Sequence, residues 1–249
     1  MNVVEPSLTR NDELRAELRD ACLKECSGAA KSIRQAMQAI AKNPTDVATL
    51  YELYNQVHSL AENASVTRLL TIARIVGAFD ALLKQLVDKP DSVTQCVRRT
   101  MAQSIDLLAT LFEGEGQEVD LATARALAVD DQQIALRSVM HALEKANLKS
   151  QALSDPSAGF SVAQEWQFDL IVLDHEMPGM TGAELCKKLR ALPNYKKTPI
   201  LFVTSASGFE HRAEICRSGG TDVIAKPFLS TELGLKALTL IVKSRTTVS

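Results

Sequence analysis

The sequence predicts a two-domain chain, with an all-α domain followed by an α/β domain. From Asn11 to about Phe112, apolar residues recur at helical spacing with few glycines and almost no β-branched runs. From about residue 124, short apolar runs alternate with helix-length segments, which is the pattern of a parallel sheet covered on both faces. We therefore predict a helical domain over 9–112, a linker over 113–123 and an α/β domain over 124–243.

The helical domain is divided by three breaks with turn or capping residues. They lie at 43–46 ("NPTD"), near 63–67 ("NASVT") and at 88–92 ("DKPDS"), so four or five helices with short connections are expected. Short connections make successive helices antiparallel neighbours, which favours a helical bundle. On the second helix, the inner stripe runs through Leu50, Val57 and Ala64, and His58 falls on the outer stripe.

The linker, "EGEGQEVDLAT", combines acidic residues and two glycines with few large apolar residues. Beyond it, the apolar runs predict five strands with helices between them, and right-handed βαβ connections make the sheet parallel. The expected strands cover 126–129, 148–153, 169–173, 199–203 and 221–225.

Polar residues close four of these strands. Asp130 and Asp131 follow the first strand, Asp174 the third, Thr204 the fourth and Lys226 the fifth. Because the carboxyl ends of parallel strands meet at one edge, we expect these side chains to converge there. Three clustered carboxylates repel one another unless a cation compensates them, and hard oxygen ligands select Mg²⁺.

Asp174 is the predicted nucleophile of this set. It stands alone at the end of the middle strand, facing both the paired acids and Lys226. With Mg²⁺ and the ammonium group neutralising the charge, its carboxylate can attack an incoming phosphoryl group and form an acyl phosphate.

Residues 124 to 243 resemble the receiver domain of two-component response regulators. The resemblance rests on "VDD", "LDHEMPGMTG", "FVTSA" and "AKPF", which occur in the family's order. It implies a (βα)5 flavodoxin-like fold, a cis peptide before Pro227 and a set of site roles. Those roles are Asp174 as phosphoacceptor, Asp130, Asp131, Asp174 and the backbone carbonyl of Glu176 as Mg²⁺ ligands, Thr204 as hydrogen-bond partner of the phosphoryl group, and Lys226 as its ion-pair partner.

The chain departs from the receiver pattern at Val223. Receivers usually carry an aromatic residue there, which moves inward together with the threonine on phosphorylation. Valine has no ring to move, so the resemblance does not predict how the switch works in this chain.

Residues 9 to 112 resemble a histidine phosphotransfer (HPt) domain. His58 falls at the phosphohistidine position, and the apolar register is matched at Leu60, Ile72, Ile75 and Phe79, with Asp80 as the acidic residue that often follows. The family's lysine and glycine after the histidine are replaced by Ala61 and Glu62. These changes remove a positive charge and add a bulky negative one, so His58 is also readable as an ordinary surface histidine.

The resemblances imply a phosphorelay protein that accepts a phosphoryl group on Asp174 from a histidine kinase or an HPt partner. Output is expected through contact with a downstream protein or with the chain's own helices, and catalysis is limited to self-phosphorylation and slow autodephosphorylation. Three alternatives remain: a relay between Asp174 and His58, a scaffold, and a Mg²⁺-dependent phosphatase of the haloacid dehalogenase type, although Glu176 stands where that family has a second aspartate.

Composition bears on partners and location. A formal net charge of −2 and a pI near 6.1 give no reason to expect nucleic acid or an anionic membrane as partner. No stretch reaches the ~18 apolar residues of a membrane span, and the N-terminus lacks the pattern of a signal peptide. We therefore expect a cytoplasmic protein, with a homodimer left open.

Overall fold

The computed structural model describes residues 10–67, 69–114, 118–205 and 209–246. The chain divides into two compact units, which we call the helical unit (Met1–Pro90 and Ile105–Glu118) and the sheet unit (Asp91–Ser104 and Val119–Ser249). Part of the predicted linker, residues 115–117, lies outside the described residues.

The helical unit confirms that the N-terminal region is helical. It contains α1 (Arg10–Lys42), α2 (Val47–Val66), α3 (Leu70–Asp88) and the second half of α4 (Gln95–Glu113), and a short 3-10 helix, η1 (Pro90–Ser92), precedes α4. The second helix, α2, packs against both α1 and α3. Its buried residues follow the predicted inner stripe: Leu50, Leu53, Val57, Leu60 and Ala64.

The sheet unit contains the predicted parallel sheet of five strands. They are β1 (Arg125–Val129), β2 (Lys149–Leu153), β3 (Leu170–Leu173), β4 (Ile200–Thr204) and β5 (Asp222–Ala225). The strand order is β2-β1-β3-β4-β5, and every neighbouring pair is parallel, which is the flavodoxin-like order. Both ends of every observed strand lie within one residue of the predicted boundaries.

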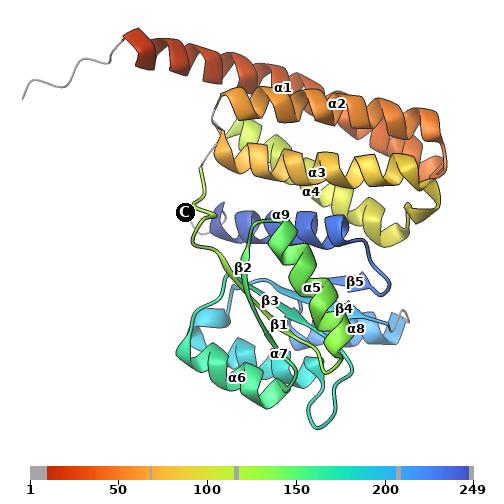
Figure 1. Ribbon diagram of the computed structural model, residues 1–249, viewed down its shortest axis with the longest axis vertical. Helices are drawn as coiled ribbons and strands as arrows, with labels where there is room; N and C mark the ends of the chain where they lie inside the picture. Colours follow the sequence, from red (N-terminus) through yellow and green to blue (C-terminus); the bar gives the residue numbers. More distant parts are fainter. Residues whose placement is uncertain (1–9, 68, 115–117, 206–208, 247–249) are drawn as a thin grey trace, which may run out of the picture. The chain divides into compact units, whose positions relative to one another are not determined.

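Helices cover both faces of this sheet (Figure 1). One face carries α5 (Gln133–Lys145) and α9 (Ser230–Thr246), which contact each other. The other carries α6 (Pro156–Glu165), α7 (Gly182–Ala191) and α8 (Phe209–Ser218), with the short η2 (Pro193–Tyr195) after α7. Strand β3 is buried along its whole length because it lies in the middle of the sheet between these layers.

The first half of α4 belongs to the sheet unit and meets α9 through buried polar groups. The ammonium nitrogen of Lys236 lies 2.8 Å from Asp222 Oδ2 and 3.0 Å from Gln103 Oε1. Burial alone would raise the pKa of Asp222, but the attraction of Lys236 outweighs it and lowers that pKa. Thr100 Oγ1 donates to Glu232 Oε1 at 3.4 Å. The contact therefore depends on satisfied polar pairs as well as on apolar packing.

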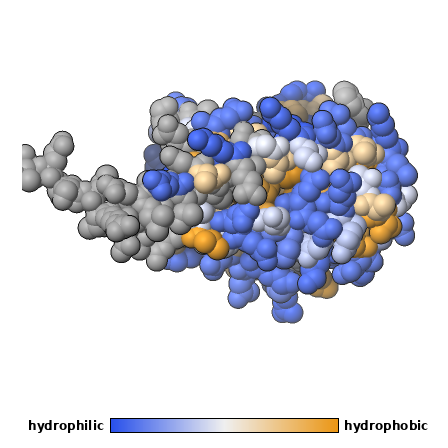
Figure 2. Space-filling view, turned by 90° about the horizontal axis from the view of Figure 1, so that it is seen from above, coloured by the Kyte–Doolittle hydropathy of each residue, from blue (hydrophilic) through white to orange (hydrophobic). Residues whose placement is uncertain are grey.

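The surface view in Figure 2 is mainly hydrophilic, with hydrophobic residues in small separate patches. Among the described residues, no helix combines the length and the apolar character needed to cross a membrane.

Candidate functional site

The carboxyl edge of the sheet brings together the polar residues predicted from the strand ends. Asp130 and Asp131 follow β1, Asp174 follows β3, and Lys226 follows β5. One carboxylate oxygen from each of the three aspartates lies within 4.8 Å of the others. The parallel register of β1 and β3 produces this convergence. Val129 pairs with Leu173, so the residues that follow these two strands leave the sheet side by side.

Lys226 joins two of the carboxylates. Its ammonium nitrogen lies 2.7 Å from Asp130 Oδ2 and 2.7 Å from Asp174 Oδ1. Burial works against the charged ammonium, but the hydrogen bonds to Asp130 and Asp174 outweigh it and raise the pKa of Lys226. The lysine therefore stays cationic and neutralises part of the acidic cluster.

Asp174 is almost fully enclosed, with 5% of the residue exposed. Its Oδ2 atom accepts a hydrogen bond from the backbone N–H of Glu176 at 2.9 Å, while Oδ1 faces Lys226. Burial raises the pKa of Asp174 above its usual value, and Lys226 opposes that rise. The side chain is thus held in one orientation by a donor at each oxygen.

Asp131 supports a fit of this cluster to a metal ion. Its Oδ1 atom is buried and has no hydrogen-bond partner among the described residues. A buried, unpartnered carboxylate oxygen is costly unless a cation or water binds it. Asp130 uses one oxygen for Lys226 and the other for the backbone N–H of Gln132, at 2.9 Å. The donor set consists of oxygen atoms, which suits Mg²⁺.

Gly182 was not identified from the sequence, yet it shapes the backbone of the site. It begins α7, and a β-carbon at this position would lie 1.9 Å from the carbonyl oxygen of Asp174. Its own N–H donates to the carbonyl of His175 at 2.9 Å. A capping box between Thr181 and Glu184 starts the same helix. Only glycine allows α7 to begin this close to Asp174.

The other predicted site residues lie on β4 and β5. Thr204 ends β4 and is 2% exposed, and its carbonyl accepts from the N–H of Lys226 at 2.8 Å. The peptide between Lys226 and Pro227 is cis, as the resemblance implied. Val223 is partly buried and lines a cavity of about 370 Å³ together with Arg98, Arg99 and Arg212, among others.

In the helical unit, His58 lies on the exposed side of α2, with 48% of its side chain accessible. Its Nδ1 atom is 3.0 Å from Asp80 Oδ1 on α3, and its Nε2 atom is 3.8 Å from Glu62 Oε1. The imidazole also stacks on Tyr54. The ring therefore has one carboxylate near each nitrogen.

Comparison with known proteins relates the C-terminal region to one family. Residues 126–238 match the family model of the response regulator receiver domain. The cyclic di-GMP phosphodiesterase response regulator RpfG of Xanthomonas campestris pv. campestris (strain 8004) is 32% identical over 115 residues, which are 45% of this chain and 30% of that protein. The transcriptional regulatory protein SrrA of Staphylococcus aureus (strain NCTC 8325 / PS 47) is 31% identical over 121 residues, or 49% of each chain.

These matches span only part of the relatives. The chain covers less than half of the length of RpfG and of SrrA. Among solved structures, the chemotaxis response regulator CheY4 of Vibrio cholerae is 36% identical, with coverage of 47% of this chain and 98% of that chain and a TM-score of 0.45.

Proposed function

We propose that this chain is a phosphorelay protein whose Asp174 accepts a phosphoryl group from a histidine kinase or an HPt partner. The match of residues 126–238 to the response regulator receiver domain supports this proposal. The observation that carries the proposal is the arrangement around Asp174. Its carboxylate is oriented by Lys226 and the N–H of Glu176, and it shares its edge of the sheet with Asp130 and Asp131.

The proposed reaction is a displacement at phosphorus. A carboxylate oxygen of Asp174 forms a bond to phosphorus, the bond from phosphorus to the donor's imidazole nitrogen breaks, and the electron pair stays on that nitrogen. Lys226 compensates the negative charge that gathers at the site, and Thr204, at the end of β4, donates its hydroxyl hydrogen to a phosphoryl oxygen. Release then follows when water attacks the acyl phosphate and restores the carboxylate.

The metal belongs to the same proposal. Asp130, Asp131, Asp174 and the backbone carbonyl of Glu176 would hold Mg²⁺, and the unpartnered Oδ1 atom of Asp131 supports this assignment. When bound, the ion would supply charge neutralisation and a template for the phosphoryl oxygens.

The test is labelling of the full-length protein with acetyl phosphate and Mg²⁺. We expect base-labile phosphate on the wild type and none on Asp174→Asn. The matched control is Asp155→Asn, because Asp155 is a carboxylate outside the acidic cluster that caps α6, and asparagine caps equally well. Label retained by Asp174→Asn, or lost from Asp155→Asn, would contradict the assignment. Continuous turnover of p-nitrophenyl phosphate would favour the phosphatase alternative instead.

A relay between Asp174 and His58 is the second candidate, and one contact favours it. Asp80 accepts a hydrogen bond from Nδ1 of His58 when that nitrogen is protonated, which leaves Nε2 as the nucleophilic nitrogen. Glu62 opposes it, since its carboxylate stands near Nε2 and repels an incoming phosphoryl group. In the labelling experiment, acid-labile, base-stable phosphate that disappears in His58→Gln would support the relay.

Glu62 offers a sharper test of this relay. If it blocks transfer, Glu62→Gln raises the acid-labile fraction, while Glu52→Gln, an exposed change on the same helix, leaves it unchanged. Equal, negligible fractions in all three proteins would leave His58 as a surface histidine.

The remaining parts of the proposal concern the whole chain. Residues 9–112 would act as an HPt-like domain joined by residues 113–123 to the receiver domain over 124–243. The protein would work in the cytoplasm, and phosphorylation would alter contact with a downstream protein or with the chain's own helices. A homodimer is compatible with this scheme.

A further inference from the structure

A second group of ligating side chains lies in the sheet unit, separate from the acidic cluster. It consists of His175, His211 and Glu214, and one nitrogen or oxygen atom from each lies within 4.8 Å of the others. The Nε2 atom of His175 is 3.3 Å from Nδ1 of His211 and 3.4 Å from Oε2 of Glu214.

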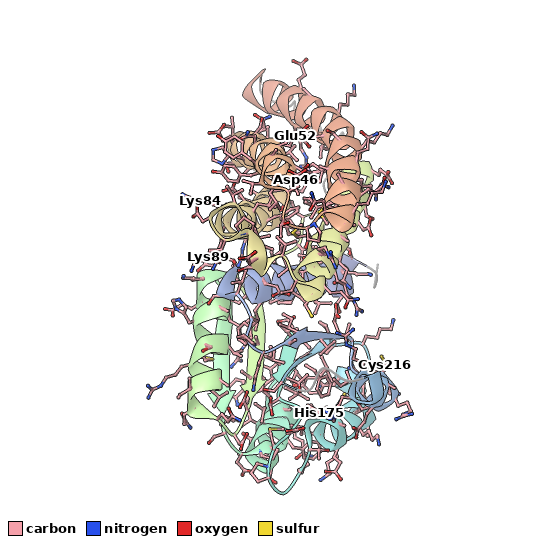
Figure 3. The ribbon with its side chains drawn as sticks, turned by 90° about the vertical axis from the view of Figure 1, so that its right-hand side faces the viewer. Asp46, Glu52, Lys84, Lys89, His175 and Cys216 are labelled. Carbon is pink, nitrogen blue, oxygen red and sulfur yellow. The ribbon has the colours of Figure 1, made fainter. Side chains whose placement is uncertain are left out.

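Two segments of the fold supply these residues. His175 follows Asp174 directly, is 5% exposed, and packs edge-on against Phe202 (His175 is labelled in Figure 3). His211 and Glu214 lie on α8, three residues apart, so they share one face of that helix. Nδ1 of His175 is buried with no partner among the described residues, so Nε2 is the ring nitrogen that makes the polar contacts.

Hydrogen bonding alone does not satisfy this cluster. Nε2 of His175 carries either one hydrogen or one lone pair, but it faces both a nitrogen and a carboxylate oxygen at hydrogen-bond range. If Nε2 carries a lone pair, the carboxylate of Glu214 repels it. If Nε2 carries a hydrogen, that one hydrogen must be shared between Glu214 and His211. A cation between the three groups would attract all of them at once.

Two of the three ligand separations match those in a tetrahedral metal site. With metal–ligand bonds of about 2.0–2.2 Å, two ligands of a tetrahedron lie roughly 3.3–3.6 Å apart. The two distances from His175 Nε2, 3.3 and 3.4 Å, fall in this range. Two imidazole nitrogens with one carboxylate oxygen are ligands typical of Zn²⁺ and unlike the all-oxygen set of Mg²⁺.

We propose that His175, His211 and Glu214 form a binding site for a divalent transition metal of the Zn²⁺ class, with the fourth position left to water. Because Glu214 keeps 45% of its side chain exposed, the site is reachable from solvent. A metal bound here ties the residue next to Asp174 to α8. The proposal stands independently of phosphoryl transfer to Asp174, since it concerns different ligands and a different metal.

The experiment measures Zn²⁺ binding by the full-length protein in competition with a chromophoric chelator, with excess Mg²⁺ present to occupy oxygen sites. We expect one competed Zn²⁺ per chain. The affinity for this Zn²⁺ should fall by at least about tenfold in both His211→Gln and Glu214→Gln, because each variant loses a direct metal ligand. Mutation of residues that only hydrogen-bond to a metal ligand already lowers metal affinity by about 10–100-fold. Both residues are partly exposed, so both variants should fold.

The control variants are His141→Gln, an exposed histidine on α5, and Asp131→Asn in the acidic cluster. Both should bind Zn²⁺ as the wild type does. Zn²⁺ should also raise the unfolding midpoint of the wild type and of these controls, but not that of His211→Gln. Unchanged Zn²⁺ affinity in both site variants, or equal loss in Asp131→Asn, would overturn the proposal. Because no phosphodonor is present, failure here would leave the function proposed for Asp174 untouched.

Discussion

Glu232 makes the stability of the sheet unit depend on pH near neutrality. This residue begins the buried stretch of α9 and is 2% exposed. Burial raises its pKa from 4.5 to about 7, although Lys236 and the hydrogen bond from Thr100 oppose the rise. The folded protein therefore holds a proton on Glu232 at pH values where the unfolded chain has released it.

The sign and size of the effect follow from this difference in pKa. The native state binds more protons than the unfolded state between pH 4.5 and about 7. The stabilisation that Glu232 contributes to the folded state is therefore fully present below pH 4.5 and is lost as the pH rises to about 7. A difference of about 2.5 pH units at about 1.4 kcal/mol each gives a loss on the order of 3 kcal/mol.

The assay is urea unfolding of full-length wild type and Glu232→Gln at pH values from 5 to 8.5. The fluorescence of Trp166, the chain's one tryptophan, reports on the sheet unit. Glutamine cannot ionise, so the variant should lose this pH dependence and be the more stable protein at pH 8. The exposed Glu144→Gln should retain the wild-type pH profile. Parallel profiles for wild type and Glu232→Gln would refute the reasoning.

Two further predictions concern the site at the strand ends, both measured by the same fluorescence titration. Gly182→Ala should destabilise the sheet unit by about 3 kcal/mol or more, because its β-carbon meets the backbone of Asp174. Gly77→Ala lies in an open position of α3 in the helical unit, so its unfolding is followed by far-UV circular dichroism, and it should be neutral or stabilising by up to about 1 kcal/mol. Equal effects of the two substitutions would contradict the contact. Lys226→Met should destabilise the protein by about 3 kcal/mol without Mg²⁺, since it leaves Asp130 and Asp174 without their ammonium partner. Mg²⁺ should restore more stability to this variant than to the wild type, and an identical response would argue against a metal at the cluster.

Much of the fold could be predicted because its signals are local. Apolar runs such as "LIVL" mark strands that are buried on both faces, and helical spacing on α2 placed Val57 inside and His58 outside. The convergence of Asp130, Asp174 and Lys226 was also predictable, because parallel topology sends all strand ends to one edge.

Other features depend on residues far apart in the sequence. Glu214 and His211 show a helical spacing of three, yet nothing local indicates that His175 faces them. The need for glycine at position 182 is also not visible in the sequence, because only the structure places the carbonyl of Asp174 where a β-carbon would lie. These contacts arise from the packing of α7 and α8 on the sheet, which local patterns do not encode.

The sequence by itself determined that a helical region precedes a five-stranded parallel α/β domain and that three acids and a lysine close its strands. Periodicity and strand-end chemistry are properties of short segments, so they are readable without coordinates. Only the tertiary structure decided which atoms meet: Lys226 between two carboxylates, Asp131 with an unpartnered oxygen, and His175 beside His211 and Glu214. Those pairings depend on ångström-scale placement of side chains from different elements, which is set by the packed core as a whole.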